Sequence, residues 1–503
     1  MMRYHIFAVA REIVARQRRA CNTTISQRLN ITASPRTPKR QLLDELGKSA
    51  WTTKEQVIHG APGINAVAIL ASKEFTSWVE DDNFMTSFLD TLLKSASGLQ
   101  ADCSGLHVLS GVTDALCPHP QSSEVSQGFS VLCGPNDSML PGLLEGDRFD
   151  DTKQDNSASV TFAIDPLVGT TREFDVTVPL ANTMFQNGKR STLYASRWEV
   201  SSGGSIDMLT KQSKTIQRIR GASNLANYTS SIIPLLPLTP PRKIVASLGN
   251  IVRQVEVDGS PTPASKELEA IIPAIFEERA QREPSTFSSR PIGVWCWVIP
   301  RHVKAKIFNN LELFKAGSSQ TDADIVQRSM PIFSELLSSG CRLHKILSGG
   351  GGWGLKQGLL SLDPETKFSL PDEDNDDLER FIKSFEERKN TEPTNGLAPP
   401  GSSLLFCVEP SVADMEALSS QAPMLKKKLT FGVAPNLDHK LDTGSPPGDV
   451  KITDGHFGIS SAAGLFLQSC PAVSRRGSDK TACGSSQGSF TTKIDVPGAY
   501  LYV

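Results

Sequence analysis

The stretch INAVAILA, residues 64–71, decides the fold class, because it is a short apolar run of strand length. A second strand candidate is GLHVLSGV, residues 105–112. Between these two runs, apolar side chains recur at the spacing of one helical face: Phe84, Phe88, Leu89, Leu92 and Leu93. Strand, helix and strand in this order predict a βαβ-like opening.

The middle of the chain is rich in strand patterns, separated by turn-rich pieces. The stretch IIPLLPLTPPR, residues 232–242, contains four prolines and is predicted to be a connector or an extended arm rather than a regular element. Strand candidates before this connector are residues 128–132, 157–164, 174–180 and 191–200.

Beyond the connector, helical and strand patterns are mixed. A helix is predicted to begin after Ser265, with Glu267 and Glu269 in its first turn and a kink at Pro273. The run IGVWCWVI, residues 292–299, is the best candidate for a buried strand. Three further strand candidates follow at residues 403–408, 428–433 and 494–503.

These patterns together predict an α/β to α+β protein with two β-containing lobes and flanking helices. We expect an N-terminal domain over residues 55–245 and a C-terminal domain over residues 246–503. Residues 372–400 begin with an acidic block and end in Pro, Gly and Asn, so they are expected to form an acidic surface insertion.

The composition is that of an ordinary folded protein. Of 503 residues, 39% are hydrophobic and 21% are charged, which is enough apolar surface to offset chain entropy. The longest apolar run, residues 292–299, is far shorter than the roughly 20 residues of a membrane-spanning helix, so no integral membrane segment is expected. The nine cysteines contain no C-x-x-C pair, which indicates free thiols in a reducing compartment.

The first 40 residues have the composition of a mitochondrial presequence. They hold nine Lys and Arg residues, one acidic residue and several hydroxyl side chains. We expect import into the mitochondrial matrix and cleavage between about residues 20 and 45; the alternative is a disordered basic tail that binds nucleic acid. Subtracting these charges from the 52 basic and 54 acidic residues leaves 43 and 53, so the remainder carries −10.

The most unusual local sequence is HKILSGGGGWGLKQGLLSLD, residues 344–363. Glycine-rich turns can bring backbone N–H groups together around an anion. The P-loop pattern fails here because Leu355 and Lys356 follow Gly354, where Lys and then Ser or Thr would be needed. The run is therefore either a tight loop packed by Trp353 or a ligand-binding loop with Lys356 as counter-charge. The candidate ligand-binding residues are Gly349, Gly350, Gly351, Gly352, Trp353, Gly354, Lys356 and His344.

Other chemical signatures are weak. The nearest metal-like group is Cys117, His119 and Cys133, with His107 and Asp114 upstream, and we predict no metal site there. No catalytic motif occurs, although a Ser/His/Asp triad assembled from distant residues stays open. The basic, aromatic segment at residues 189–198 could contact RNA, but an amphipathic strand fits its alternation, and the net charge disfavours a nucleic-acid partner.

Several stretches resemble fungal FIST-domain proteins, a family whose name joins F-box and intracellular signal transduction. The stretches that resemble the family, which cover much of residues 60–370, are INAVAILASKEF (64–75), GLHVLSGVTDALCP (105–118), EVSQGFSVLCG (124–134), VPLANTMFQNGKRSTLYASRW (178–198) and LSGGGGWGLKQGLLSLDPE (347–365). The resemblance implies a sensory or binding domain for small, amino-acid-like ligands without established catalysis. It carries over no ligand-contacting residue, and the chain has no kinase, receiver or F-box segment.

Three functions follow as hypotheses. The first is a mitochondrial protein that binds a small metabolite, with residues 349–354 closing on the ligand. The second is an enzyme that binds a phosphorylated or acyl substrate through N–H groups of the same loop. The third is a protein-assembly or scaffold factor with a protein partner. The sequence indicates no cofactor and leaves the ligand unidentified.

Overall fold

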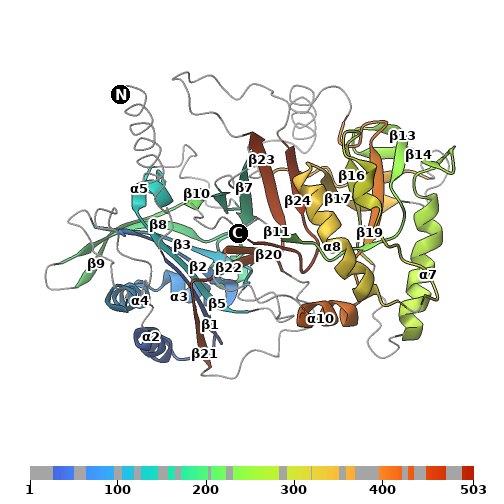
Figure 1. Cartoon of the computed structure of the whole chain (residues 1–503). Helices are drawn as coiled ribbons and strands as arrows, with labels where there is room; N and C mark the ends of the chain where they lie inside the picture. The colour runs from blue at the N-terminus through green and yellow to red at the C-terminus, as the bar shows by residue number, and fades with distance from the viewer. Residues whose placement is uncertain are drawn as a thin grey trace, which may run out of the picture.

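A computed structural model of the chain is shown in Figure 1. The residues that it describes are 27–49, 64–95, 105–117, 126–145, 157–164, 172–201, 205–221, 230–282, 292–318, 320–349, 358–368, 396–421, 429–434, 449–471 and 490–502. Within these segments, no helix is both long and apolar enough to cross a membrane.

The predicted βαβ opening lies at the centre of a seven-stranded sheet. Strand β2 (Ala66–Ser72) leads through helix α4 (Asp82–Ser95) to β3 (Leu106–Thr113), which pairs with β2 in parallel. The other neighbouring strands are antiparallel, in the order β21-β1-β5-β2-β3-β8-β9. Their bounds are β1 Gln27–Ala33, β5 Gly128–Gly134, β8 Leu193–Val200, β9 Ile206–Ser213 and β21 Val450–Asp454.

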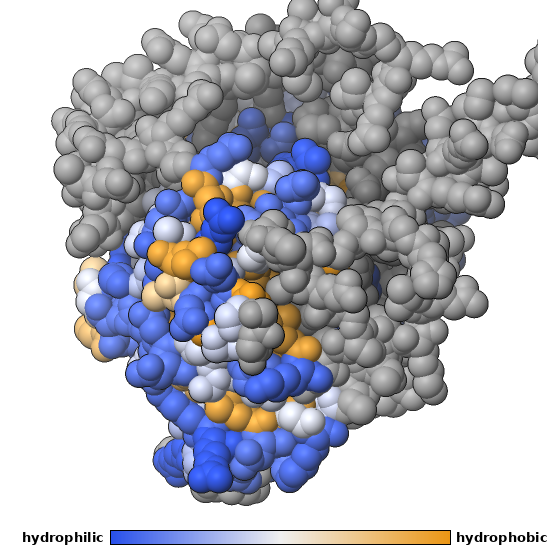
Figure 2. All heavy atoms as spheres, turned by 90° about the vertical axis from the view of Figure 1, so that its left-hand side faces the viewer, coloured by the Kyte–Doolittle hydropathy of each residue, from blue (hydrophilic) through white to orange (hydrophobic). Residues whose placement is uncertain are grey.

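Helices cover one face of this sheet (Figure 1). The helices are α2 (Lys39–Lys48), α3 (Thr76–Glu80) and α4, and a short 3-10 turn, η1 (Lys73–Phe75), precedes α3. The alternate strand residues Val67, Ile69 and Ala71 point into the same core as the apolar face of α4. On the side that carries α4 and β9, the surface is mostly hydrophilic, with separate apolar patches (Figure 2).

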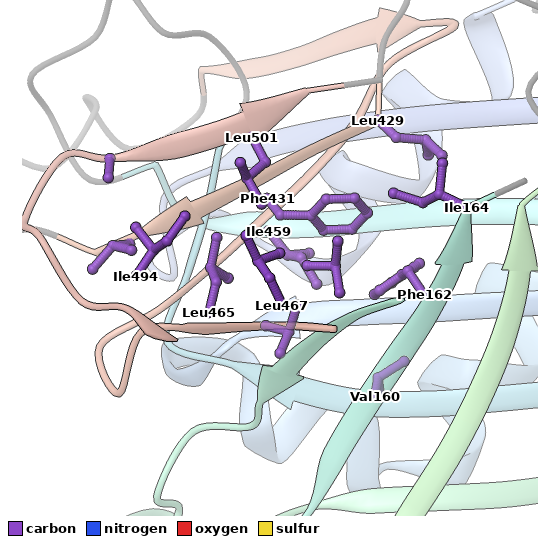
Figure 3. Close-up of a cluster of buried hydrophobic side chains, with 14 of the residues drawn as sticks. Val160, Phe162, Ile164, Leu429, Phe431, Ile459, Leu465, Leu467, Ile494 and Leu501 are labelled. Carbon is purple, nitrogen blue, oxygen red and sulfur yellow. The ribbon is translucent and has the colours of Figure 1, made fainter. Parts of the chain in front are cut away.

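Two smaller sheets pack on the other face. One has the order β10-β6-β7-β23-β24 and the other β11-β25-β20-β22-β4. Phe162 and Phe431, one from each sheet, meet with ring centres 4.6 Å apart in the shared core (Figure 3). The bounds are β4 Ala115–Leu116, β6 Ser159–Ile164, β7 Arg172–Pro179, β10 Ile216–Gly221, β11 Ser230–Ile232, β20 Leu429–Val433, β22 Phe457–Ser461, β23 Leu465–Pro471, β24 Phe490–Ile494 and β25 Tyr500–Tyr502. Short helices α5 (Asn136–Met139) and α6 (Met184–Asn187) lie in the connections.

The second unit is a sheet that closes on itself. Its pairings run β19-β13-β14-β18-β17-β16, and β16 pairs again with β19. Helices α7 (Lys266–Arg282), α8 (Asp322–Ser338) and α10 (Val412–Gln421) and the turn η2 (Ala305–Phe308) belong to this unit. The strands are β12 Leu236–Pro237, β13 Arg242–Leu248, β14 Ile251–Val257, β15 Ser260–Pro263, β16 Val294–Ile299, β17 Arg342–Gly349, β18 Leu360–Leu362 and β19 Ser403–Val408.

The architecture is therefore α/β to α+β with two β-containing units, as predicted, but the units are assembled differently along the chain. The C-terminal strands β20 to β25 return to the sheets of the first unit. The second unit thus lies within residues 236–421, between two parts of the first. The sequence did not predict this arrangement, because strand pairing depends on long-range contacts that a local pattern does not contain. Residues 372–395 of the expected insertion lie outside the described residues, whereas Leu397 and Ala398 are buried.

The N-terminal boundary also differs from the expected one. Residues 1–26 lie outside the described residues, but residues 27–40 of the expected presequence belong to the fold. Strand β1 lies between β5 and β21, and its residues Leu29 and Ile31 are completely buried. The first unit therefore begins no later than Gln27, rather than at residue 55.

Candidate functional site

The glycine run begins where β17 ends. Gly349 pairs with Leu360 of β18, and the chain is described again from Gly358, which has a φ of +81°. Six of the eight predicted ligand-binding residues lie outside the described residues: Gly350, Gly351, Gly352, Trp353, Gly354 and Lys356. The site can therefore be built only from the residues on both sides of the run.

His344 fastens the two sides of the glycine run together. It is buried on β17 opposite Cys296, and its Nδ1 lies 2.9 Å from the carbonyl oxygen of Asp363. Because a carbonyl oxygen only accepts, Nδ1 carries the proton and donates. The backbone N–H of Asp363 in turn donates to the carbonyl of Lys345 over 2.8 Å. The structure thus places His344 as an anchor for the segment that follows β18.

A group of charged side chains and one tryptophan lies near Asp363, where the two units meet. Strand β17 contacts β24, and the backbone N–H of Leu343 donates to Thr492 Oγ1 over 2.9 Å. We call the group the seam cluster; its members are Trp295, Lys345, Asp363, Glu365, Lys493 and Asp495. Four of its members come from the second unit and two, Lys493 and Asp495, from the returning C-terminal segment.

Lys493 is the most constrained member of the seam cluster. Its ammonium lies 2.5 Å from Glu365 Oε2, 3.4 Å from Asp363 Oδ2 and 5.6 Å from the ring centre of Phe466. Burial by itself would lower the pKa of Lys493, but the hydrogen bond and charge of Glu365, helped by Asp363, outweigh it and raise that pKa. Lys493 is therefore a fixed positive charge at neutral pH.

Asp495 is held at one oxygen only. The indole Nε1–H of Trp295 donates to Asp495 Oδ1 over 2.7 Å, and no other hydrogen bond from a described residue reaches this carboxylate. Burial raises the pKa of Asp495, while the indole and the charges of Lys493 and Lys345 offset part of that rise. A half-buried carboxylate with an unused acceptor oxygen is suited to receive an N–H donor.

A second cation lies over the ring of Trp295, the residue that donates to Asp495. The Lys345 ammonium lies 5.5 Å from the ring centre of Trp295, within the range of a cation–π interaction. With its acids ionised, the seam cluster holds two lysines and three carboxylates, a net charge of −1. This net negative charge favours a ligand with a cationic or N–H donor group over a phosphate.

A second charged group, in the second unit, has a structural explanation. Arg279 of α7 lies 3.6 Å from Asp322 of α8, and its Nη2 donates to the carbonyl of Glu409 over 2.8 Å. Asp414 of α10 accepts from the backbone N–H of Ala323 over 3.2 Å. These contacts join three helices, so we place no ligand there.

The described thiols are poor nucleophiles and form no metal site. Burial raises the pKa of Cys117, Cys133 and Cys341 to about 12 and that of the other described cysteines, Cys296 and Cys407, also well above its usual value, so these thiols stay protonated at neutral pH. In the described part of the chain, no group of three or more His, Cys, Asp or Glu side chains could hold a metal ion. His119 of the candidate metal group lies outside the described residues.

Sequence reasoning singled out the stretch 344–363, which contains Lys345 and Asp363, but it missed the other members of the seam cluster. Lys493 and Asp495 lie about 140 residues beyond the glycine run, and the contact of β24 with β17 brings them near it. Trp295 was recognised only as part of a buried strand. A Lys and an Asp two residues apart at the end of a strand were the available signal.

No family model, curated protein or solved structure matches the chain. The resemblance to FIST-domain proteins therefore stays a prediction, and the function has to be argued from the geometry of the site.

Proposed function

We propose that this protein binds a small metabolite carrying an amine or ammonium group, and that the seam cluster receives it. The observation that carries the proposal is the carboxylate of Asp495, with one oxygen held by Trp295 and the other unpartnered among the described residues. An N–H donor at that oxygen would gain a charge-assisted hydrogen bond in a partly desolvated setting.

The position of the glycine run supports the proposal. Lys345 and the first glycine, Gly349, are four residues apart on one strand, roughly 13 Å at about 3.3 Å per residue. Glycine backbone can approach a ligand closely because it has no Cβ atom. A ligand held at Asp495 would therefore lie within reach of the segment predicted to close on it.

The same charges argue against the alternative of a phosphorylated substrate. Asp363, Glu365 and Asp495 would all repel a phosphate, and the nearer cation, Lys493, already interacts with two of them. We therefore favour binding over catalysis, in the manner that the FIST resemblance suggests.

We also propose that the protein is imported into mitochondria. The basic composition of the first residues supports import, and the position of β1 limits where a processing enzyme could cut. A cleavage site must precede Gln27, because a later one would remove part of a strand paired on both sides.

Thermal unfolding of the full chain tests the binding function. Amino acids and other amines are compared with their carboxylate, phosphate and acyl analogues, because a ligand at 100 times its Kd adds about 2.7 kcal/mol to stability. We expect an amine to raise the Tm of the native protein.

The variant Asp495→Asn should abolish that rise, because the amide keeps an acceptor for Trp295 but loses the charge. The matched control is Asp207→Asn, at an exposed position on β9, and it should respond like the native protein. A panel in which only phosphates shift the Tm, or an Asp495→Asn variant that still responds to the amine, would contradict the proposal.

A further inference from the structure

An exposed aromatic side chain stands at the tip of a turn in the first unit. Helix α6 forms this tip, and its Phe185 is 97% exposed, while its neighbour Met184 is 40% exposed. An aromatic side chain this exposed makes almost no contact with its own chain, so it adds nothing to the apolar core. A large apolar group held out in this way is a feature of interaction surfaces.

Hydrogen bonds from Thr183 and Asn187 hold the turn that carries Phe185 in place. Thr183 is buried, and its Oγ1 lies 2.9 Å from both the carbonyl of Lys189 and the hydroxyl of Thr192. Asn187 donates to Glu80 over 3.0 Å and to Thr192 over 2.8 Å. The turn is therefore ordered before any partner arrives, which lowers the entropy lost on binding.

The charges beside this turn are already paired. Glu80 accepts from Lys189 at 2.9 Å and from the hydroxyl of Tyr194 at 2.7 Å. The ring of Tyr194 carries both Lys189 and Lys211 within 5.0 Å of its centre. Asp81 and Asp82, which follow Glu80, pair with Lys39 and Lys211 at 2.5 and 2.7 Å.

This pairing limits what can bind there. Because Lys39, Lys189 and Lys211 neutralise the three carboxylates, this face has no excess of positive charge to attract anionic lipid, so a membrane is disfavoured. From Gln27 onward the chain has 47 basic and 53 acidic residues, a net charge of −6, so two copies repel each other over most of their surface. Beside α6, three acids and three lysines balance in ion pairs, and a surface with both signs can meet its own copy about a two-fold axis.

We propose that the face formed by Met184, Phe185 and the paired charges at residues 80–82 and 189 is a contact between two copies of this chain. Phe185 of one copy packs on Met184 and Phe185 of the other. The apolar tip is much smaller than the roughly 800 Å² per partner of a stable interface, so the dimer is weak and depends on protein concentration.

Sedimentation velocity of the full chain over a wide range of concentrations tests this contact. The native protein shifts from monomer to dimer as its concentration rises. The variant Phe185→Ser loses that shift. The control Leu209→Ser, which removes another exposed apolar side chain from a bulge in β9, keeps it. A native protein that stays monomeric throughout, or a Phe185→Ser variant that dimerises like the native one, overturns the proposal.

A photo-crosslinker locates the contact independently of its strength. With p-benzoylphenylalanine in place of Phe185, crosslinks between two copies map to residues 182–190 of the second copy. Crosslinks confined to another part of the second copy would refute a two-fold contact at this face.

Discussion

Removing residues 1–40, as the presequence prediction suggests, should unfold the first unit. The truncation deletes β1, whose Leu29 and Ile31 are both completely buried. Each fully buried side chain of this size contributes about 1.5–3 kcal/mol, so the two together contribute about 3–6 kcal/mol. That amount is comparable with the whole stability of a typical domain, about 5–15 kcal/mol.

The loss of hydrogen bonds adds to this cost. Strand β1 pairs with β5 over residues 27–32 and with β21 over residues 29–33, and β21 has no other strand partner in the described part of the chain. Without β1, β21 detaches and β5 becomes an edge strand with unpaired N–H and C=O groups. We expect the 41–503 protein to be aggregated or unfolded at 25 °C.

Circular dichroism during urea unfolding measures the effect. The chain starting at Gln27 is the matched control, and it should unfold at the same midpoint as the full chain. The variant Leu29→Ala in the full chain should lose about 2–5 kcal/mol. If the 41–503 protein unfolded cooperatively at the midpoint of the 27–503 protein, β1 would not be part of the folded core and the reasoning would be refuted.

Three further predictions concern single positions. Gly458→Ala should lower stability by about 1–3 kcal/mol or more in urea unfolding, because a Cβ there would lie 1.9 Å from the carbonyl oxygen of Cys117; an unchanged midpoint would contradict this. Gly47→Ala should instead add about 0.5–1 kcal/mol, since the new methyl meets only ordinary contacts in helix α2, and a loss of stability would count against the packing described. Trp295→Phe should cost about 1–3 kcal/mol at neutral pH by removing the N–H that Asp495 accepts. The pKa of Asp495 is raised in the folded protein and rises further in this variant, so the stability deficit should grow as pH increases above the usual range of a carboxyl, and a deficit that grows toward acid pH would exclude this cause.

The sequence predicted those elements whose local pattern agrees with their final environment. Strand β2, within the expected run, is buried on both faces, and the helix that begins after Ser265 has Glu267 and Glu269 in its first turn and Pro273 inside it, as expected. Strand β1 was misread because the basic residues around Leu29 and Ile31 match an import signal, although its apolar residues Leu29, Ile31 and Ala33 alternate as a strand requires.

The candidate site was harder to predict for a different reason. The glycine run is conspicuous locally, whereas the seam cluster exists only because β24 lies beside β17. Lys493 and Asp495 lie in an unremarkable stretch of sequence, and of their partners Trp295 belongs to β16 and Glu365 follows β18. Contacts of this kind depend on the order of strands in a sheet, which local composition does not contain.

The order of strands in the first sheet determines when, during synthesis, this sheet can be completed. Thr32 of β1 pairs with Lys451 of β21, so a ribosome must add about 420 residues before that ladder can close. At about 5–20 residues per second, β1 waits roughly 20–80 seconds for its partner, while the entire second unit emerges and can fold in between. The newly made chain therefore exposes the unpaired edge of β1 for much of its synthesis. We expect a chaperone that holds unfolded chains to bind at this edge.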